Sequence, residues 1–310
     1  MSRFIAKRIL NIIPILLGVS FIVFSILSLT PGDPGSLILG PNAQPEAINQ
    51  LNEQLGFNQP FFIRYLNYVA DVIFRFDFGN SYRTGDPVMT EIIQKFPITF
   101  TVAFWSIIVA SIIGVTAGIY SALKQYSLSD IMTTVTAMLL ASIPNFWLGL
   151  MLILFFSLTL RWLPSNGIDT WRHFVLPTIT IALPTSAGII RLTRSTMLET
   201  IRQDYIRTAR AKGAKELTVV FKHALKNALL PVITFMGTSL GWLLGGTVIT
   251  ETIYALPGLG TLLLTAIRSK DVPMVMAATL FISFFYCIVM IIVDVLYGVV
   301  DPRIKAKYKR

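Results

Sequence analysis

Ser239 stands in the stretch Gly237-Thr-Ser239-Leu-Gly241, where small residues flank a serine in the manner of a hydrolytic nucleophile. Such a serine needs a general base within hydrogen-bond reach. The chain has two histidines, His173 and His223, and both lie outside the apolar stretch that holds Ser239. An intramembrane serine protease is therefore a remote alternative, and the serine is better explained as part of an apolar helix.

The glycines around Ser239 have a structural explanation. Gly237, Gly241 and Gly245 recur every four residues, so they share one helix face on which a second backbone can approach closely. Gly114 and Gly118 repeat this spacing in another apolar stretch. We predict that both sets form helix-packing seams.

Metal and nucleotide chemistry have no recognisable basis in the sequence. A phosphate-binding loop of the form G-x-x-x-x-G-K-[ST] is not present, so we do not expect this chain to bind ATP in that manner. One cysteine, Cys287, and two histidines cannot supply the spaced ligand clusters that hold zinc. We expect no catalytic residue and no cofactor or metal site in this chain.

Two acidic residues, Glu251 and Asp294, fall inside apolar stretches, where an ionisable side chain is costly and often functional. Each lies close enough to the end of its stretch to be solvated or paired with Lys or Arg. The alternative is that they contact the solute or act as a gate. A proton relay is not expected, because it needs a chain of such groups across the membrane.

A basic segment separates two apolar stretches and reads Asp204-Tyr-Ile-Arg-Thr-Ala-Arg-Ala-Lys-Gly213, followed by His223-Ala-Leu-Lys-Asn-Ala-Leu-Leu-Pro231. It is too polar to insert into lipid, where Lys and Arg are costly. Its composition favours helix, with one break at Gly213. We interpret it as a docking surface for a partner outside the membrane rather than as a simple connector.

Membrane-spanning helices must position these residues. Hydrophobic residues make up 54% of the 310-residue chain and charged residues 14%, whereas charged residues are about a quarter of a soluble protein. The apolar residues gather in runs of about 20, the length that a helix needs to cross a bilayer. We predict an all-α polytopic membrane protein with six transmembrane helices, the third tilted or broken at Pro144. The predicted spans are 9–29, 98–123, 131–160, 174–192, 229–253 and 274–300.

The distribution of basic residues predicts the orientation. Eighteen of the 26 Lys and Arg residues fall in the N-terminus, the 124–130 turn, the 191–228 loop and the C-terminus. The positive-inside rule therefore places these regions, and both termini, in the cytoplasm. Anionic lipid also accounts for the net charge of +10. Nucleic-acid binding is not expected, because it calls for basic residues interleaved with aromatic residues on a soluble face.

The 31–96 segment is the longest stretch outside the spans. A short helix is predicted over 45–55, and an aromatic, apolar stripe at helical spacing follows over 61–73. We expect the stripe to lie on the outer membrane surface or to pack on the loops. Two interpretations stay open for it: an interfacial helix held by aromatic anchors, and a contact surface for a substrate carrier outside the cell.

The basic segment of 204–231, together with several shorter motifs in their order along the chain, resembles the permease subunits of binding-protein-dependent ABC importers, in the dipeptide, oligopeptide and nickel branch. The family's Glu-Ala-Ala segment, with Gly after three further residues, corresponds to Arg207-Thr208-Ala209 and Gly213. Arg and Thr at the first two positions, and the long stretch from Gly213 to Pro231, are similar to the peptide branch. Other matching motifs are Pro31-Gly-Asp-Pro34, Leu55-Gly-Phe, Leu163-Pro-Ser, Glu251-Thr-Ile-Tyr-Ala-Leu-Pro-Gly-Leu-Gly260 and Asp301-Pro-Arg303.

The resemblance implies a type I ABC importer permease fold that forms half of a translocation pathway and has no enzymatic activity. It implies a second homologous permease, two cytoplasmic ATPases that hold ATP and Mg, an extracytoplasmic solute-binding protein, and membrane lipid as partners. A short helix over 214–225 would insert into a groove of the ATPase after a sharp turn at Gly213. The implied coupling residues are Arg207, Thr208, Ala209, Arg210, Gly213, Ala214, Lys215, Glu216, Leu217 and His223.

The expected domains are an anchor helix (1–30), an extracytoplasmic segment (31–96), a permease core (97–302) with the coupling loop (193–228), and a basic cytoplasmic tail (303–310). The resemblance implies a multi-pass protein of a prokaryotic cell membrane that imports di- or oligopeptides, with nickel or a metal chelate as the alternative. A stand-alone channel is a remote alternative, because the halves show no repeat. Polar candidates for the pathway or a gate are Ser142, Asn145, Thr238, Ser239, Thr247, Glu251 and Asp294.

Overall fold

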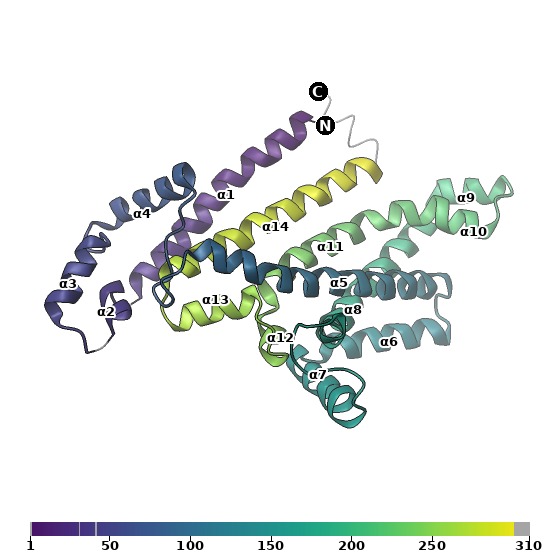
Figure 1. The fold of residues 1–310 in the computed structure, drawn as a ribbon. Helices are drawn as coiled ribbons and strands as arrows, with labels where there is room; N and C mark the ends of the chain where they lie inside the picture. Colours follow the sequence, from purple (N-terminus) through teal and green to yellow (C-terminus); the bar gives the residue numbers. More distant parts are fainter. Residues whose placement is uncertain (1, 31, 41, 301–310) are drawn as a thin grey trace. The chain divides into compact units, whose positions relative to one another are not determined.

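The computed structural model describes residues 2–30, 32–40 and 42–300, and their regular structure is helical (Figure 1). The predicted basic tail, 303–310, and the Asp301-Pro-Arg303 motif lie outside the described residues. Extended pairing within the described part is confined to an isolated bridge between Asn80 and Pro87. The helices are α1 (Ser2–Leu29), α2 (Pro34–Leu39), α3 (Pro45–Gln54), α4 (Phe61–Ala70), η1 (Asp71–Arg75), α5 (Val88–Leu123), α6 (Leu128–Ser142), α7 (Asn145–Leu152), η2 (Ile153–Thr159), η3 (Trp171–Phe174), α8 (Val175–Ile201), α9 (Asp204–Ala211), α10 (Glu216–Thr218), η4 (Val219–Ala224), α11 (Leu225–Gly246), α12 (Val248–Ile253), α13 (Leu259–Arg268) and α14 (Val272–Val300).

Five helical segments of the described chain are long and apolar enough to cross a membrane: Arg8–Leu29, Val88–Leu123, Trp171–Ile201, Glu216–Gly246 and Val272–Leu296. The remaining predicted span, 131–160, is a pair of helical segments bent by 97°. The prediction of six spans therefore holds when this bent pair is counted as one. The all-α, multi-pass membrane architecture is confirmed.

Pro144 causes the bend, as the sequence predicted. Proline disfavours helical geometry in the residue before it, and Ile143 is accordingly extended, with φ −77° and ψ 124°. Pro144 itself is the N-cap of α7, a position that needs no amide donor. Ser142 and Asn145 therefore lie on either side of a bend rather than on one face of a continuous helix.

The chain folds into two compact units, each assembled from separate segments. The first consists of Met1–Ile5, Ile98–Leu256 and Tyr286–Arg310, and the second of Ala6–Pro97 and Pro257–Phe285. Segments that are far apart in sequence thus share a core in both units, which is typical of a helical membrane protein whose spans pack out of sequence order.

In the first unit, residues of α5, α8 and α11 share a buried apolar core. Buried Ile107 of α5, Ile189 of α8 and Val232 of α11 belong to one apolar cluster. The α5 glycines make this packing close: a Cβ added to Gly114 would lie 2.5 Å from Ile189, and one added to Gly118 would lie 2.6 Å from a Thr193 side-chain carbon. The predicted seam on α5 is confirmed.

In the second unit, α13 and the start of α14 pack on the first turns of α5, with Leu259, Met274 and Ile92 among the buried residues. The carboxylate of Asp271 fixes the loop before α5, because it accepts hydrogen bonds from the Ser81 hydroxyl and, at 3.1 Å, from the Tyr82 amide. The helix predicted over 45–55 is α3, Pro45–Gln54.

The aromatic stripe of 61–73 is helical as predicted, and one of its faces packs on α1. Phe61 and Tyr65 of α4 have ring centroids 5.3 and 5.6 Å from that of Phe24 on α1. The Tyr65 hydroxyl also lies 3.0 Å from that of Ser20 on the same helix. One face of the stripe therefore packs on the apolar surface of α1, while Phe62 and Leu66 stay exposed, and its location at the outer membrane surface stays a prediction.

Candidate docking site in the basic loop

The basic loop forms a helical hairpin, here the 204–224 hairpin, that consists of α9, a turn and the helix that begins with α10. Gly213 makes the turn possible, since its φ of +78° lies in the left-handed region that favours glycine. Its amide donates to the Arg210 carbonyl at 2.9 Å, and the Ala214 amide donates to the Ala209 carbonyl at 3.2 Å. The predicted sharp turn at Gly213 is confirmed.

The helix expected over 214–225 is not a separate element. The helical segment that begins at Glu216 continues through η4 and α11 to Gly246. The short separate helix is α9, Asp204–Ala211, which precedes Gly213 instead of following it. No helix breaker stands between Gly213 and Pro231, and a proline within the apolar part of a helix does not end it when neighbours compensate the lost hydrogen bond.

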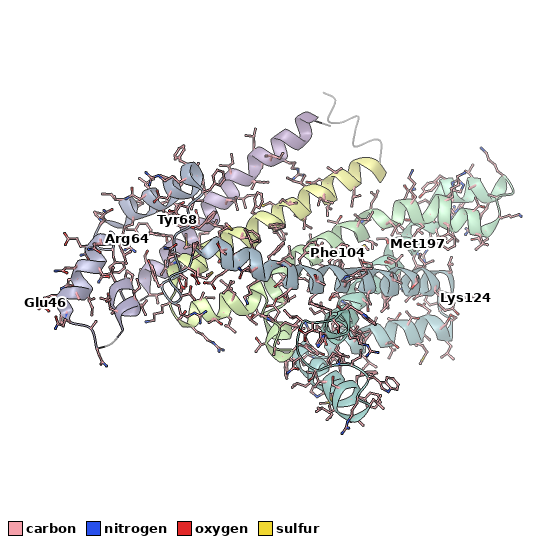
Figure 2. All side chains as sticks on the ribbon, in the orientation of Figure 1. Glu46, Arg64, Tyr68, Phe104, Lys124 and Met197 are labelled. Atoms are coloured by element: carbon pink, nitrogen blue, oxygen red, sulfur yellow. The ribbon has the colours of Figure 1, made fainter. Side chains whose placement is uncertain are left out.

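One buried side chain anchors α9 to the body of the first unit. Ile206 has no exposed surface and packs in a cluster with Met197 of α8 and with Val219 and Val220 of η4 (Met197 is labelled in Figure 2). Burial of an isoleucine contributes about 1.5–3 kcal/mol. The hairpin therefore shares a buried core with α5 and α8.

Two polar contacts close the hairpin. Arg210 donates from Nη2 and Nε to the two carboxylate oxygens of Glu216, at 2.6 and 3.1 Å. Asn227 donates from Nδ2 to the Tyr205 hydroxyl at 2.8 Å. The first contact crosses the Gly213 turn and the second ties the start of α9 to α11. Both pairs are exposed, so each contributes little alone, but together they restrict the angle between the two arms.

The outer surface of the hairpin presents large apolar side chains. Leu217 is 74% exposed and Phe221 is 56% exposed, and Tyr205 on the opposite arm is 43% exposed. Spacing of about four residues places Leu217 and Phe221 on one face of the helix. Exposed apolar groups next to charged neighbours are typical of a protein-binding site.

The other predicted coupling residues surround this face. Ala209, Ala214 and His223 are half-buried, and Gly213 is exposed with no atom within 4 Å of a Cβ built on it. Exposed residues with charged or polar side chains complete the set: Arg207, Thr208, Arg210, Lys215 and Glu216. The sequence analysis did not identify Tyr205, Ile206, Phe221 and Asn227. Burial of Ile206 could have been predicted, because it is the one aliphatic β-branched residue in the polar helix α9.

A buried ion pair stiffens the helices beneath the hairpin. Arg194 of α8 donates to both oxygens of Asp130 in α6, at 2.7 and 2.8 Å, and the Ser121 hydroxyl of α5 donates to the same carboxylate at 2.5 Å. Asp130 is 3% exposed. Side chains of three helices therefore meet at one carboxylate, and the ion pair joins residues 64 positions apart, which no local pattern predicts.

The glycine seam predicted on α11 is confirmed at two of its three positions. A Cβ on Gly237 would clash with Val293 of α14, and one on Gly241 would clash with Tyr286 of the same helix. Gly245 is exposed, so it takes no part in this seam. The serine between them does not meet a histidine: Ser239 lines a cavity of about 470 Å³ whose described lining includes no His.

That cavity also includes Thr238, the second candidate for the pathway on α11, together with Arg191 of α8 and Trp242. Ser142 and Asn145 are exposed at the Pro144 bend, and Asp294 is half-buried. The structure thus brings Thr238 and Ser239 together, and it places the remaining polar candidates elsewhere.

Glu251 is not solvated, contrary to one of the two interpretations of its structural role. It is completely buried, and its Oε1 accepts hydrogen bonds from Thr99 at 2.6 Å and from Thr247 at 2.8 Å. Thr247 is itself 1% exposed. The carboxylate therefore connects α5 to the segment between α11 and α12, because a buried acidic group must find hydrogen-bond donors.

Sequence comparisons define the class of the protein. Residues 114–306 match the family described as binding-protein-dependent transport system inner membrane component, and residues 1–103 match the N-terminal family of such membrane components. The chain belongs to this family of transport permeases. The resemblance predicted from the sequence motifs is confirmed.

Two relatives align over nearly the whole chain. The identity is 40% over 333 residues to the dipeptide transport system permease protein DppB of Alkalihalophilus pseudofirmus, covering 98% of this chain and 100% of the relative. It is 38% over 307 residues to the glutathione transport system permease protein GsiC of Escherichia coli, covering 99% and 100%.

Solved structures share the fold. An inward-facing structure of the MetNI methionine ABC transporter matches with a TM-score of 0.58 and 20% identity, over 69% of this chain and 98% of that chain. The predicted ABC importer permease fold is confirmed by this match, which at this level of identity concerns the fold alone.

Proposed function

We propose that this chain is a membrane-spanning subunit of an ATP-driven peptide importer and forms half of its translocation pathway. Two relatives with 40% and 38% identity are named as dipeptide and glutathione transport permeases, and both substrates are small peptides. Nickel or a metal chelate is the alternative solute within the same family. A second permease subunit encloses the other half, and a solute-binding protein delivers the peptide.

The 204–224 hairpin is the proposed docking site for a cytoplasmic ATPase. The observation that carries this proposal is the contrast between its two faces: Ile206 is fully buried in the body of the unit, while Leu217 and Phe221 are largely exposed. The exposed apolar face can bind the ATPase, and because the buried face is fixed to the unit, a displacement of the hairpin is passed on to the helices that it packs against. ATP and Mg would be bound by the partner, and this chain would supply no catalytic group.

The mechanism follows from the continuity of the helix. Because α10, η4 and α11 form one helical segment, displacement of Leu217 by a closing ATPase moves Thr238 and Ser239 as well. These residues line the cavity between α8 and α11. Closure of the ATPases would then bias the bundle between inward-open and outward-open states, which is coupling through a two-state element.

Reconstitution tests the proposal. The chain, its second permease and the two ATPases are placed in bacterial-lipid proteoliposomes, and uptake of a radiolabelled dipeptide is measured with the binding protein outside and ATP inside. We expect uptake that requires all components and ATP. Uptake without the ATPases, or of nickel chelate but not dipeptide, would contradict the proposed function. Labelling of cysteines introduced at Leu217 from the cytoplasmic side tests the orientation separately.

A further inference from the structure

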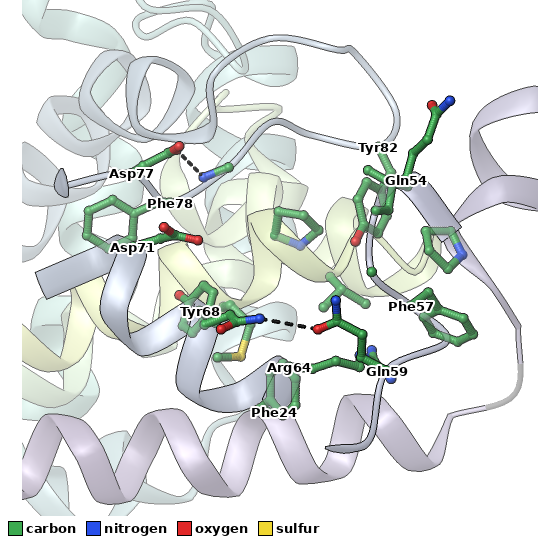
Figure 3. Close-up of a pocket in the computed structure, with 18 residues that line it drawn as sticks. Phe24, Gln54, Phe57, Gln59, Arg64, Tyr68, Asp71, Asp77, Phe78 and Tyr82 are labelled. Carbon is green, nitrogen blue, oxygen red and sulfur yellow. Dashed lines mark hydrogen bonds between the residues drawn. The ribbon is translucent and has the colours of Figure 1, made fainter. Parts of the chain in front are cut away.

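Arg64 of α4 lies between two cavities of the second unit. The first has a volume of about 390 Å³ and the second about 500 Å³, and Arg64 and Tyr82 line both. Figure 3 shows Arg64 with Phe24, Phe57, Gln59 and Tyr82 around the first cavity. The two are together called the Arg64 cavity, and their volumes are those of small-ligand sites.

The guanidinium is stacked but not neutralised. Its Cζ lies 4.5 Å from the ring centroid of Phe57 and 5.6 Å from that of Phe24. No carboxylate among the described residues lies within ion-pair distance of it. Burial lowers the pKa of Arg64, so its surroundings disfavour the charged form without supplying a compensating acid.

The acidic residues that line the cavity have other partners. Asp71 binds Arg75 at 2.9 Å, and Asp77 accepts from the Gly79 amide at 2.8 Å (Figure 3). Asp33 accepts from the Asn52 side chain at 2.7 Å and caps α2. Because these carboxylates already have hydrogen-bond or ion-pair partners, the half-buried guanidinium of Arg64 keeps its five N–H donors for a ligand. Their planar arrangement matches the two oxygens of a carboxylate.

We propose that the Arg64 cavity binds a carboxylate carried on a peptide chain. Gln54, Gln59 and Asn67 also line it; Asn67 donates to Gln59 Oε1 at 3.2 Å, and the remaining N–H groups of these amides can serve the adjoining peptide bonds. The aromatic rings of Phe57 and Phe78 offer apolar contacts. Two sources carry this chemistry: the C-terminal carboxylate of a free peptide, and an acidic side chain of the docked solute-binding protein. The proposal rests on the proposed function, because it assumes that the second unit faces the solute.

The first arm of the test uses a free peptide. The full chain in lipid nanodiscs is titrated with Ala-Phe and with its C-terminal amide, which differs only in lacking the carboxylate. We expect Ala-Phe to bind at least tenfold more tightly than the amide, and Arg64→Gln to abolish that difference. Arg83→Gln is the matched control, because Arg83 is exposed and does not line the cavity.

The second arm uses the peptide-free binding protein and the assembled importer. If the carboxylate comes from that protein, docking weakens at least tenfold in Arg64→Gln and is unchanged in Arg83→Gln. Arg64→Lys keeps the charge without the fork and is expected to fall between, which covers the case in which Arg64→Gln fails to fold. Equal behaviour of Arg64→Lys and the parent chain in both arms, with no preference for Ala-Phe over its amide, overturns the proposal. ATP-driven uptake by Arg83→Gln reports on the proposed function independently.

Discussion

The 204–224 hairpin and the Arg64 cavity both combine an arginine with large apolar side chains, but they differ in which of the two is available to a partner. In the hairpin, Arg210 is neutralised by Glu216, and the exposed face is apolar through Leu217 and Phe221. In the cavity, Phe24 and Phe57 are the internal support, and the guanidinium of Arg64 is left for a ligand. One region offers shape and apolar contact, whereas the other offers charge.

This difference fits the two tasks proposed for them. A docking site that is pushed repeatedly needs rigidity, and internal ion pairs and a buried isoleucine provide it. A recognition site needs specificity, and a directional charge provides that better than apolar surface. Four substitutions test the comparison on the hairpin side.

Gly213→Pro is expected to have the largest effect. Proline cannot adopt the φ of +78° found at Gly213, and it removes the amide that donates to Arg210. We expect complete loss of ATP-dependent uptake, measured in proteoliposomes, with normal amounts of the chain in the membrane. Gly213→Asn is the control, since asparagine tolerates the left-handed conformation and open space surrounds the Cβ position. Peptide-stimulated ATP hydrolysis at the parental rate in Gly213→Pro would refute the role of the turn.

Asp130→Ala is expected to destabilise the base of the hairpin. The substitution leaves Arg194 without its partner, and breaking a buried ion pair costs about 3–5 kcal/mol. Because Arg194 is partly exposed, we expect the free energy of unfolding to fall by about 3 kcal/mol, the low end of this range. The measurement is the midpoint of thermal unfolding in detergent, which should decrease. Asp204→Ala removes an exposed carboxylate whose ion pair with Arg207 spans 3.6 Å, and it should leave the midpoint unchanged.

Leu217→Asp is expected to weaken coupling without affecting folding. Leu217 is 74% exposed, so its replacement removes little buried surface from this chain. If its side chain enters an apolar groove of the ATPase, about tenfold weaker association follows, corresponding to about 1.4 kcal/mol. Retention of the ATPases during affinity purification measures this. Leu128→Asp, at a position that is 75% exposed in the first turn of α6, is the matched control; equal losses in both variants would indicate a general surface effect.

Arg210→Glu is expected to have the smallest effect. It replaces the ion pair with Glu216 by a repulsion on an exposed surface, where such pairs contribute about 0.2–1 kcal/mol. We expect uptake reduced by less than about half, more so at low salt because screening weakens surface charges. The double variant Arg210→Glu with Glu216→Arg should recover the parental rate. A loss as large as that of Gly213→Pro would mean that Arg210 contacts the partner directly.

The sequence was most informative where structure is local. Runs of apolar residues predicted the spans, Pro144 indicated a tilt or a break in the third span, and the sharp turn at Gly213 followed from glycine's conformational freedom. The continuation of the helix from Glu216 into α11 was missed because hydropathy reports where lipid begins, not where a helix does.

Tertiary partners could not be predicted. Asp130 and Arg194 are brought together by the packing of α6 on α8. Arg64 lies within the aromatic stripe of 61–73, and the stripe pattern gives no information about which rings surround its side chain. Glu251 was recognised as costly in lipid, but its hydroxyl donors come from Thr99 and Thr247, of which Thr99 is 152 positions away. Such contacts depend on which helices are neighbours, and one sequence does not contain that information.

The helical segment from Glu216 to Gly246 has 31 residues, which at about 1.5 Å per residue makes it about 46 Å long. The hydrocarbon of a bilayer is about 30 Å thick. An upright segment would therefore project about 16 Å past the lipid tails, which is more than the depth of one headgroup layer. Under the proposed function, the ATPase therefore reaches Leu217 in water, beyond the headgroup layer, and can bind it without displacing lipid.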